Sequence, residues 1–132
     1  MIVVVQGTNN FNDYQVFLRA IGVALSSLPK EDKQLEIFSV GPARTNTMAM
    51  EFVNVSERSM KSRGIKLKLR YVPPSWVIEN MNSINYFAYL STPNEPKGNI
   101  VKEAENNNIE VGIFKYWGQN VYSIIRKNGT NS

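Results

Sequence analysis

The sequence predicts a three-layer α/β domain built on a mostly parallel sheet of five to six strands, in the order about 3-2-1-4-5. Short apolar segments that suit strands alternate with segments whose apolar residues recur at helical steps. Most strand segments are apolar throughout, which is typical of parallel strands buried between two layers of helices. Short loops rich in Gly, Pro and Asn join the segments, as in other α/β domains.

The first strand and helix are expected within residues 2–28. Residues 2–6 are a continuous apolar, β-branched run, which favours a central strand buried on both faces. Asn12 or Asp13 can cap the helix that follows. Its apolar residues recur at three- and four-residue steps until Pro29 ends it: Tyr14, Phe17, Leu18, Ile21, Leu25 and Leu28.

The second strand, "QLEIFSVG", covers residues 34–41 and also ends at a glycine. Thr45 or Asn46 is expected to cap the second helix. One face of that helix carries Met48, Phe52 and Val55. The segment "SRG" at residues 62–64 closes the helix with a basic residue and a glycine, as helix C-termini prefer.

The third strand, "IKLKLRYV" at residues 65–72, alternates between apolar and basic residues. A parallel strand with one polar face lies at a sheet edge in most structures. The order 3-2-1-4-5 of a doubly wound, Rossmann-like sheet places its third strand at such an edge, so pattern and topology agree.

The remaining elements are assigned from shorter patterns. They are a short helix or ordered loop at 75–84, a strand at 85–91, a helix at 99–108, a strand at 109–116 and a sixth strand at 120–127. Residues 1–127 are expected to form one Rossmann-like domain, with residues 128–132 as a frayed tail.

Composition narrows the chemistry. The 132 residues include neither Cys nor His, which excludes thiol catalysis and removes the commonest general base and metal ligand, so no metal site and no cofactor are predicted. The net charge of +4 allows an anionic ligand but is modest for a nucleic-acid binder. No apolar run is long enough to cross a bilayer. The start "MIVVVQG" has the pattern of a strand and not of a signal peptide, so a cytoplasmic location is expected.

Three loops are expected to meet beyond the carboxyl ends of the strands, where open α/β sheets bind ligands. Each combines glycine with small polar residues, which lets a ligand approach the backbone. The predicted ligand-binding residues are Gly7, Thr8, Asn9, Gly41, Arg44, Thr45, Lys97, Gly98 and Asn99. The pattern lacks the two usual phosphate fingerprints, G-x-G-x-x-G and G-x-x-x-x-G-K-[ST]. Glycines that only permit tight turns, with solvated loop cations, remain the alternative interpretation.

The order of five segments resembles a known family. "GTNNFNDY" corresponds to a G-[ST]-R-x-F-x-D loop, "SVGPARTNTMA" to a strand ending in G-G-A-x-G-A-D, and "VPPSW" to a Trp after the third strand. "ENMNSINYFAYL" with "STPNEPKGN" corresponds to an R-N-x-x-M segment and a D-G-x-S-x-G-T loop, and "VKEAENNNIEVGIFKY" to a helix carrying E-A before the last strand. Over residues 2–116 the chain resembles the SLOG superfamily, in particular its YspA-like Rossmannoid branch of bacteria and phages.

This resemblance implies binding of a nucleotide or nucleotide-derived signal, and a phage protein of this type would sense or sequester a host signal in the host cytoplasm. The 16 asparagines are compatible with a phage or low-GC source. Asn9 and Glu79 stand where the family has Arg, which removes bidentate contacts to phosphate. Binding without catalysis is therefore predicted.

Two alternatives remain open. One is a hydrolase of the phosphoribohydrolase type, for N-glycosidic or phosphate bonds, with Glu103 or Glu79 as the acid/base. The other is a phage-type module that contacts a host protein through Tyr116, Trp117 and Tyr122, with a degenerate pocket. Because SLOG proteins often self-associate, a homodimer is compatible with each function. Single-strand DNA binding is disfavoured, because the basic residues follow one strand and do not alternate with aromatics.

Overall fold

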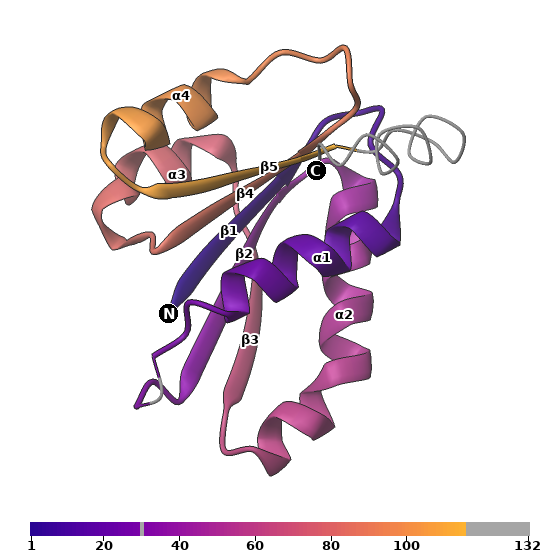
Figure 1. The fold of residues 1–132 in the computed structure, drawn as a ribbon, viewed down its shortest axis with the longest axis vertical. Coiled ribbons are helices and arrows are strands. Elements are labelled where there is room, and N and C mark those ends of the chain that lie inside the picture. Colours follow the sequence, from indigo (N-terminus) through magenta and orange to yellow (C-terminus); the bar gives the residue numbers. More distant parts are fainter. Residues whose placement is uncertain (30, 116–132) are drawn as a thin grey trace, which may run out of the picture.

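The computed structural model describes residues 1–29 and 31–115 (Figure 1). Its described strands form one parallel sheet in the order β3-β2-β1-β4-β5, which confirms the predicted Rossmann-like layout. The strands are β1 (Ile2–Gly7), β2 (Gln34–Gly41), β3 (Lys66–Tyr71), β4 (Tyr86–Ser91) and β5 (Glu110–Lys115).

The helices cover the two faces of this sheet in pairs (Figure 1). They are α1 (Tyr14–Leu25), α2 (Ala43–Ser62), α3 (Pro74–Glu79) and α4 (Asn99–Asn106), and a 3-10 turn, η1 (Met81–Ser83), follows α3. The apolar core on one face includes residues of α1 and α2, and the core on the other face includes residues of α3, η1 and α4. The three layers are therefore two helices, the sheet, and two helices with the 3-10 turn.

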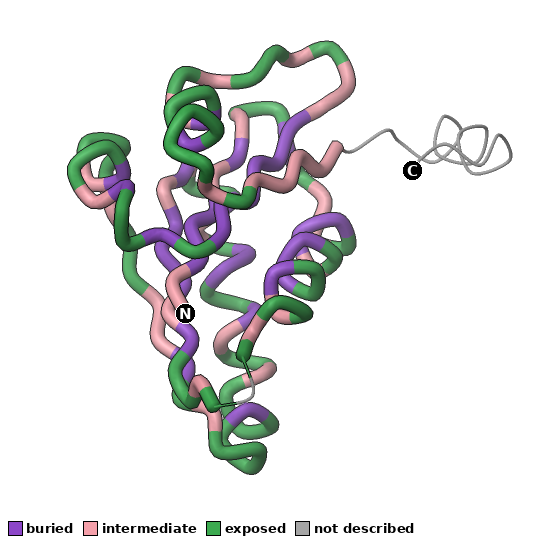
Figure 2. The backbone as a smooth tube through the Cα atoms, turned by 60° about the vertical axis from the view of Figure 1, so that its left-hand side comes forward, coloured by how far each residue is buried: buried purple, intermediate pink, exposed green. Residues whose placement is uncertain are grey.

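The central strand β1 contributes to both cores because successive side chains of a strand point to opposite faces. Val3 and Val5 pack with α1 and α2, while Val4 packs on the α3 and α4 side. All three are buried. Figure 2 colours buried residues purple, and many of them lie in the strands at the centre of the molecule. The continuous apolar run in the sequence thus reflects burial on both faces.

The strand β3 lies at the edge of the sheet, as its alternating pattern predicts. Leu67 is buried against α2, while Lys66 and Arg70 are exposed. Tyr71, which the alternation places with the apolar set, is 52% exposed at the end of the strand. The edge strand is therefore apolar on one face only.

Two details of α2 differ from the prediction. The helix begins at Ala43, with Pro42 in the capping position, so neither Thr45 nor Asn46 is the cap. Val55, expected on the buried face, is 72% exposed. The buried residues of this face advance by multiples of four, through Met48, Phe52 and Met60, with Ser56 half-buried between the last two. This spacing turns Val55 away from the sheet.

The sixth strand at 120–127 and the tail at 128–132 lie outside the described residues. Among the residues that the structure describes, no helix has the length and hydropathy that a transmembrane span requires.

Candidate functional site

The carboxyl ends of β1, β2 and β4 lie together at one edge of the sheet, because β1 pairs with β2 on one side and with β4 on the other. We call this edge the carboxyl rim, defined by Gly7, Gly41 and Ser91 with the loops that follow them. The strand order reverses between β1 and β4, which makes this part of the rim the topological switch point of the sheet. The rim has two halves, between β1 and β2 and between β1 and β4.

In the β1–β2 half, Gly7 is packed against the first turn of α2. A Cβ at position 7 would lie 2.1 Å from Thr45 Oγ1, which no side chain can do without displacing its neighbour. Thr45 is fully buried, and its hydroxyl is the one buried side-chain polar atom without a hydrogen-bond partner among the described residues. The Thr45 hydroxyl thus occupies the space that a side chain at position 7 would need.

The turn from β2 into α2 depends on Gly41, whose φ of +102° is a conformation that glycine adopts readily and other residues do not. The Gly41–Pro42 peptide bond is cis. Below the turn, the buried Ser39 hydroxyl donates a 2.6 Å hydrogen bond to Asn46 Oδ1. This bond joins the end of β2 to the first turn of α2.

The first turn of α2 leaves backbone donors free. Asn46 N–H donates to the Pro42 carbonyl at 3.0 Å, while no described group accepts from the N–H groups of Ala43, Arg44 and Thr45. A helix N-terminus with unpaired N–H groups carries partial positive charge and attracts anions. Arg44 is exposed on this turn and adds a full positive charge.

The β1–β4 half is closed by Glu95, from the loop between β4 and α4. Its Oε1 accepts hydrogen bonds from the Thr8 hydroxyl and, at 2.7 Å, from the Thr92 N–H. Its Oε2 accepts from Asn10 Nδ2 at 3.0 Å. Burial raises the pKa of Glu95, but the hydrogen bonds from Thr8, Thr92 and Asn10 outweigh burial and bring the pKa to about 2. The Glu95 side chain is therefore an anion held by donors from two loops.

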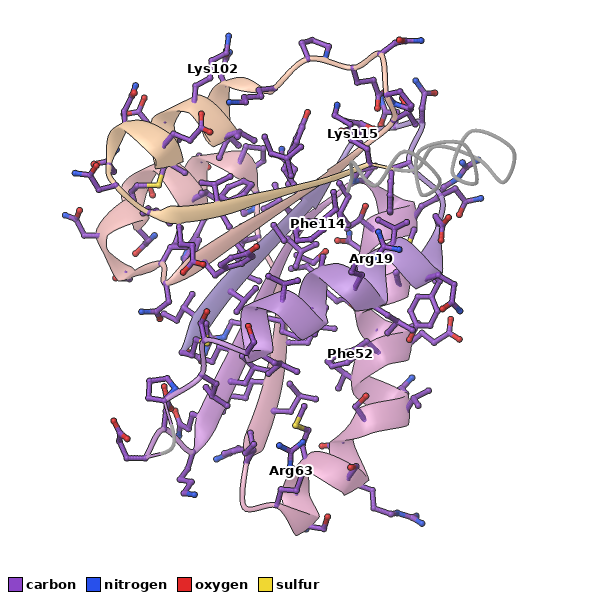
Figure 3. All side chains as sticks on the ribbon, viewed as in Figure 1. Arg19, Phe52, Arg63, Lys102, Phe114 and Lys115 are labelled. Atoms are coloured by element: carbon purple, nitrogen blue, oxygen red, sulfur yellow. The ribbon has the colours of Figure 1, made fainter. Side chains whose placement is uncertain are left out.

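Lys115 supports the same loop from the end of β5 (Figure 3). Its Nζ lies 3.4 Å from Ser91 Oγ and 3.4 Å from each of the backbone oxygens of Thr92 and Glu95. The loop after β1 is tied to β4 as well, since Thr8 N–H donates to the Leu90 carbonyl at 2.9 Å. Phe11, fully buried, anchors that loop in the core.

The other predicted ligand-binding residues are arranged differently. Asn9 is exposed in the loop after β1. Lys97 pairs with Glu105 of α4 at 3.0 Å, so its charge is directed to a helix surface. Gly98 occupies the N-cap position of α4, and Asn99 is the first residue of that helix. The predicted cluster therefore divides into two groups. Gly7, Thr8, Asn9, Gly41, Arg44 and Thr45 lie at the ends of β1 and β2, while Lys97, Gly98 and Asn99 lie at the start of α4.

The two carboxylates of the hydrolase hypothesis are exposed on helices. Glu79 is the last residue of α3, and Glu103 lies in the second turn of α4. Neither carboxylate contacts another described polar group. Trp76 stacks on Phe38 with ring centroids 4.4 Å apart, which places it against the core on the α3 side. Tyr116, Trp117 and Tyr122, proposed as a protein contact, lie outside the described residues.

Sequence reasoning missed Glu95, Asn10, Asn46 and Lys115. Glu95 contacts residues 85 and 87 positions away in the sequence, so no local spacing could reveal it. Its one local signal is that it is the only carboxylate within "STPNEPKGN". Asn46 was noticed only as a helix cap, whereas its side chain serves Ser39.

Comparison of the chain with protein-family models, with curated proteins and with solved structures gives no match. Within the described ranges, no group of three or more Asp and Glu side chains is placed to hold a metal ion. The site therefore has to be interpreted from its own geometry.

Proposed function

We propose that the chain binds a nucleotide or a nucleotide-derived signal at the carboxyl rim, with a phosphate group at the start of α2, and does not catalyse a reaction on it. The phosphate would accept hydrogen bonds from the free N–H groups of residues 43–45, as phosphates do at other helix N-termini. Arg44 would add a charge-assisted contact.

The observation that carries this proposal is the unpaired Thr45 hydroxyl. A buried hydroxyl without a partner costs about 1–3 kcal/mol, and native structures contain few of them. Thr45 holds this hydroxyl against Gly7, at the end of the central strand and beside three free N–H groups. A ligand oxygen that reached this hydroxyl, which is fully buried in the free chain, would supply the acceptor that the folded chain lacks.

The nucleotide part of the proposal rests on the fold. Sheets of the order 3-2-1-4-5 bind ligands beyond the carboxyl ends of their strands, at the point where the strand order reverses. Here that point is the β1–β4 half of the carboxyl rim, across β1 from the start of α2. This support is analogy between folds and not a contact of this chain. The positions of Glu79 and Glu103, exposed on helices and without polar partners among the described residues, favour binding over hydrolysis.

The test is titration calorimetry with mono-, di- and cyclic nucleotides, together with thermal unfolding in their presence. We expect a ligand at a hundred times its Kd to stabilise the protein by about 2.7 kcal/mol. Arg44→Ala should weaken binding about tenfold or more, because it removes a charged contact to phosphate.

Lys97→Ala is the matched control, since it removes an exposed cation that is already paired with Glu105. It should leave the affinity within about twofold. Absence of binding by every nucleotide at millimolar concentration, or equal losses in the two variants, would contradict the proposal.

A further inference from the structure

The half-buried Glu95 carboxylate is surrounded by hydrogen-bond donors in the way that a bound anionic ligand would be. Both of its oxygens are occupied, by a hydroxyl, a backbone N–H and an amide. Two of these donors belong to the loop after β1, and the third, Thr92, directly follows β4. The carboxylate thus bridges two loops at the centre of the sheet.

The donors form a set that suits any oxyanion. A hydroxyl, a backbone N–H and a side-chain amide, held about one carboxylate, are the groups that proteins use for bound carboxylates and phosphates. Lys115 Nζ lies against the backbone of the same loop and adds positive charge nearby. The depressed pKa of Glu95 agrees with this geometry, because the donors favour a negative charge.

We propose that Thr8, Asn10 and Thr92 form an oxyanion-binding site that Glu95 fills from within the chain, and that a carboxylate or phosphate group of a ligand takes its place. The site lies in the β1–β4 half of the carboxyl rim. The inference extends the proposed function, since the displacing group belongs to a ligand of the same rim. The Glu95 carboxylate then competes with the ligand for these donors and lowers the apparent affinity of the site for the ligand.

The loop that carries Glu95 can move away from Thr8 and Asn10 without exposing the apolar core. It contains no helix or strand between Ser91 and Asn99, and Asn94, Pro96 and Lys97 are exposed. Apart from the Glu95 side chain, polar contacts hold this loop. Tyr89 OH donates to the Pro96 carbonyl at 3.3 Å, Lys97 pairs with Glu105 at 3.0 Å on the surface, and Lys115 Nζ approaches the backbone. Segments held by a few polar contacts open at low free-energy cost.

The test is to remove the competitor and to add small anions. Glu95→Ala should bind inorganic phosphate or acetate about tenfold more tightly than the unaltered chain, because removing a competitor raises the apparent affinity by the inverse of the open fraction. Thermal unfolding should show that these anions stabilise Glu95→Ala and leave the unaltered chain nearly unchanged. Chloride at equal ionic strength is the control for screening.

The two anions distinguish the possible ligands. If acetate stabilises Glu95→Ala more than phosphate does, the ligand group is a carboxylate. If phosphate stabilises it more, the ligand group is a phosphate. Adding Thr8→Val to Glu95→Ala removes one donor and should abolish the rescue. Equal effects of the anions on the unaltered chain and on Glu95→Ala would overturn the proposal, since Glu95 would then be only a structural link between loops.

Glu95→Gln provides a second variant if Glu95→Ala does not fold. It keeps the side-chain volume but can set an amide nitrogen against Asn10 Nδ2, so phosphate and acetate should still bind it more tightly than the unaltered chain. These measurements use no nucleotide and no residue of α2. Failure of nucleotide binding therefore leaves this test intact, and failure of the anion rescue leaves the proposed function intact.

Discussion

The two halves of the carboxyl rim both present hydroxyl and N–H donors, but these donors have acceptors within the described residues in only one half. In the β1–β2 half, three N–H groups of α2 and the Thr45 hydroxyl have no acceptor among the described residues. In the β1–β4 half, the donors of Thr8, Asn10 and Thr92 all point to Glu95.

This difference teaches that a glycine-bearing loop at a switch point is not by itself a binding site. What distinguishes the halves is a single carboxylate that supplies the anion in one and is absent from the other.

Gly7→Ala should cost the most. The new Cβ would meet Thr45 Oγ1 at 2.1 Å, and overpacking of this kind lowers the free energy of unfolding by about 2–3 kcal/mol. Urea unfolding measures the loss. Adding Thr45→Ala to Gly7→Ala removes the clashing atom and should restore part of the stability.

Gly22→Ala is the control for the Gly7 variant. Gly22 is exposed within α1, and an added Cβ there meets nothing within 4 Å. Because alanine is the better helix former, this change should raise the free energy of unfolding by about 0.5–1 kcal/mol. A Gly7→Ala protein as stable as the unaltered chain would mean that the β1–β2 half is loosely packed.

Glu95 should make stability depend on pH. Its pKa is about 2 in the folded chain against an ordinary value of 4.5, so its contribution is complete above about pH 5 and is lost as the pH falls toward 2. Because the side chain is partly exposed, we expect about 1–2 kcal/mol after allowance for solvent screening. Urea midpoints at pH 6, 4 and 3 measure this loss.

Glu95→Gln has no titrating group at this position, so its stability should fall less steeply over the same range of pH. Asp32, whose pKa is lowered mainly by its hydrogen bond from the N-terminal ammonium, titrates in both proteins. The difference between the two pH profiles therefore isolates Glu95. Parallel profiles would show that the link between the loops contributes nothing.

Thr45→Val should stabilise the free protein and weaken ligand binding. Replacing an unpaired buried hydroxyl by a methyl group removes an unmet hydrogen bond, which we expect to add about 1 kcal/mol to the free energy of unfolding. Ser39→Ala is the matched control, because its hydroxyl is paired with Asn46 and its removal should cost about 1 kcal/mol. Losses in both variants would show that Thr45 has a partner in solution.

Lys97→Ala should have the smallest effect. Its ion pair with Glu105 is exposed on both sides, and such pairs contribute less than about 0.5 kcal/mol. Thermal unfolding in low and high salt measures it, with Glu105→Gln as the reciprocal variant. A loss above about 1 kcal/mol would mean that the start of α4 contributes to the rim more than its contacts indicate.

The sheet could be predicted from the sequence because burial dictates its pattern. The valines of β1 and the apolar run of β4 require cover on both faces, while the alternation in β3 requires one polar face. These patterns are local and separate central strands from an edge strand, while the order itself comes from the doubly wound arrangement with which they agree. The predicted cap of α2 was wrong, because Thr45 and Asn46 are good capping residues by local preference. In the folded chain, the Thr45 side chain packs against Gly7 and the Asn46 side chain accepts a hydrogen bond from Ser39, so neither caps the helix.

The site was predictable only in outline. The loops after β1, β2 and β4 meet because topology brings them together, and each of them contains or directly follows a glycine. Which donors are free and which are occupied depends on Glu95, two of whose three donors are 85 and 87 residues away. A single sequence carries no periodic signal for such a contact.

The position of β1 also has a consequence for biosynthesis. This strand is made first, yet Val3 pairs with Tyr86 of β4, so one of its two neighbours leaves the ribosome roughly ten seconds later at ordinary rates of translation. Until then β1, with β2 and β3, can form only half a sheet, whose valine-rich border is open to unwanted pairing. Rapid completion of the chain, or protection by a chaperone during that interval, should therefore govern the yield of native protein.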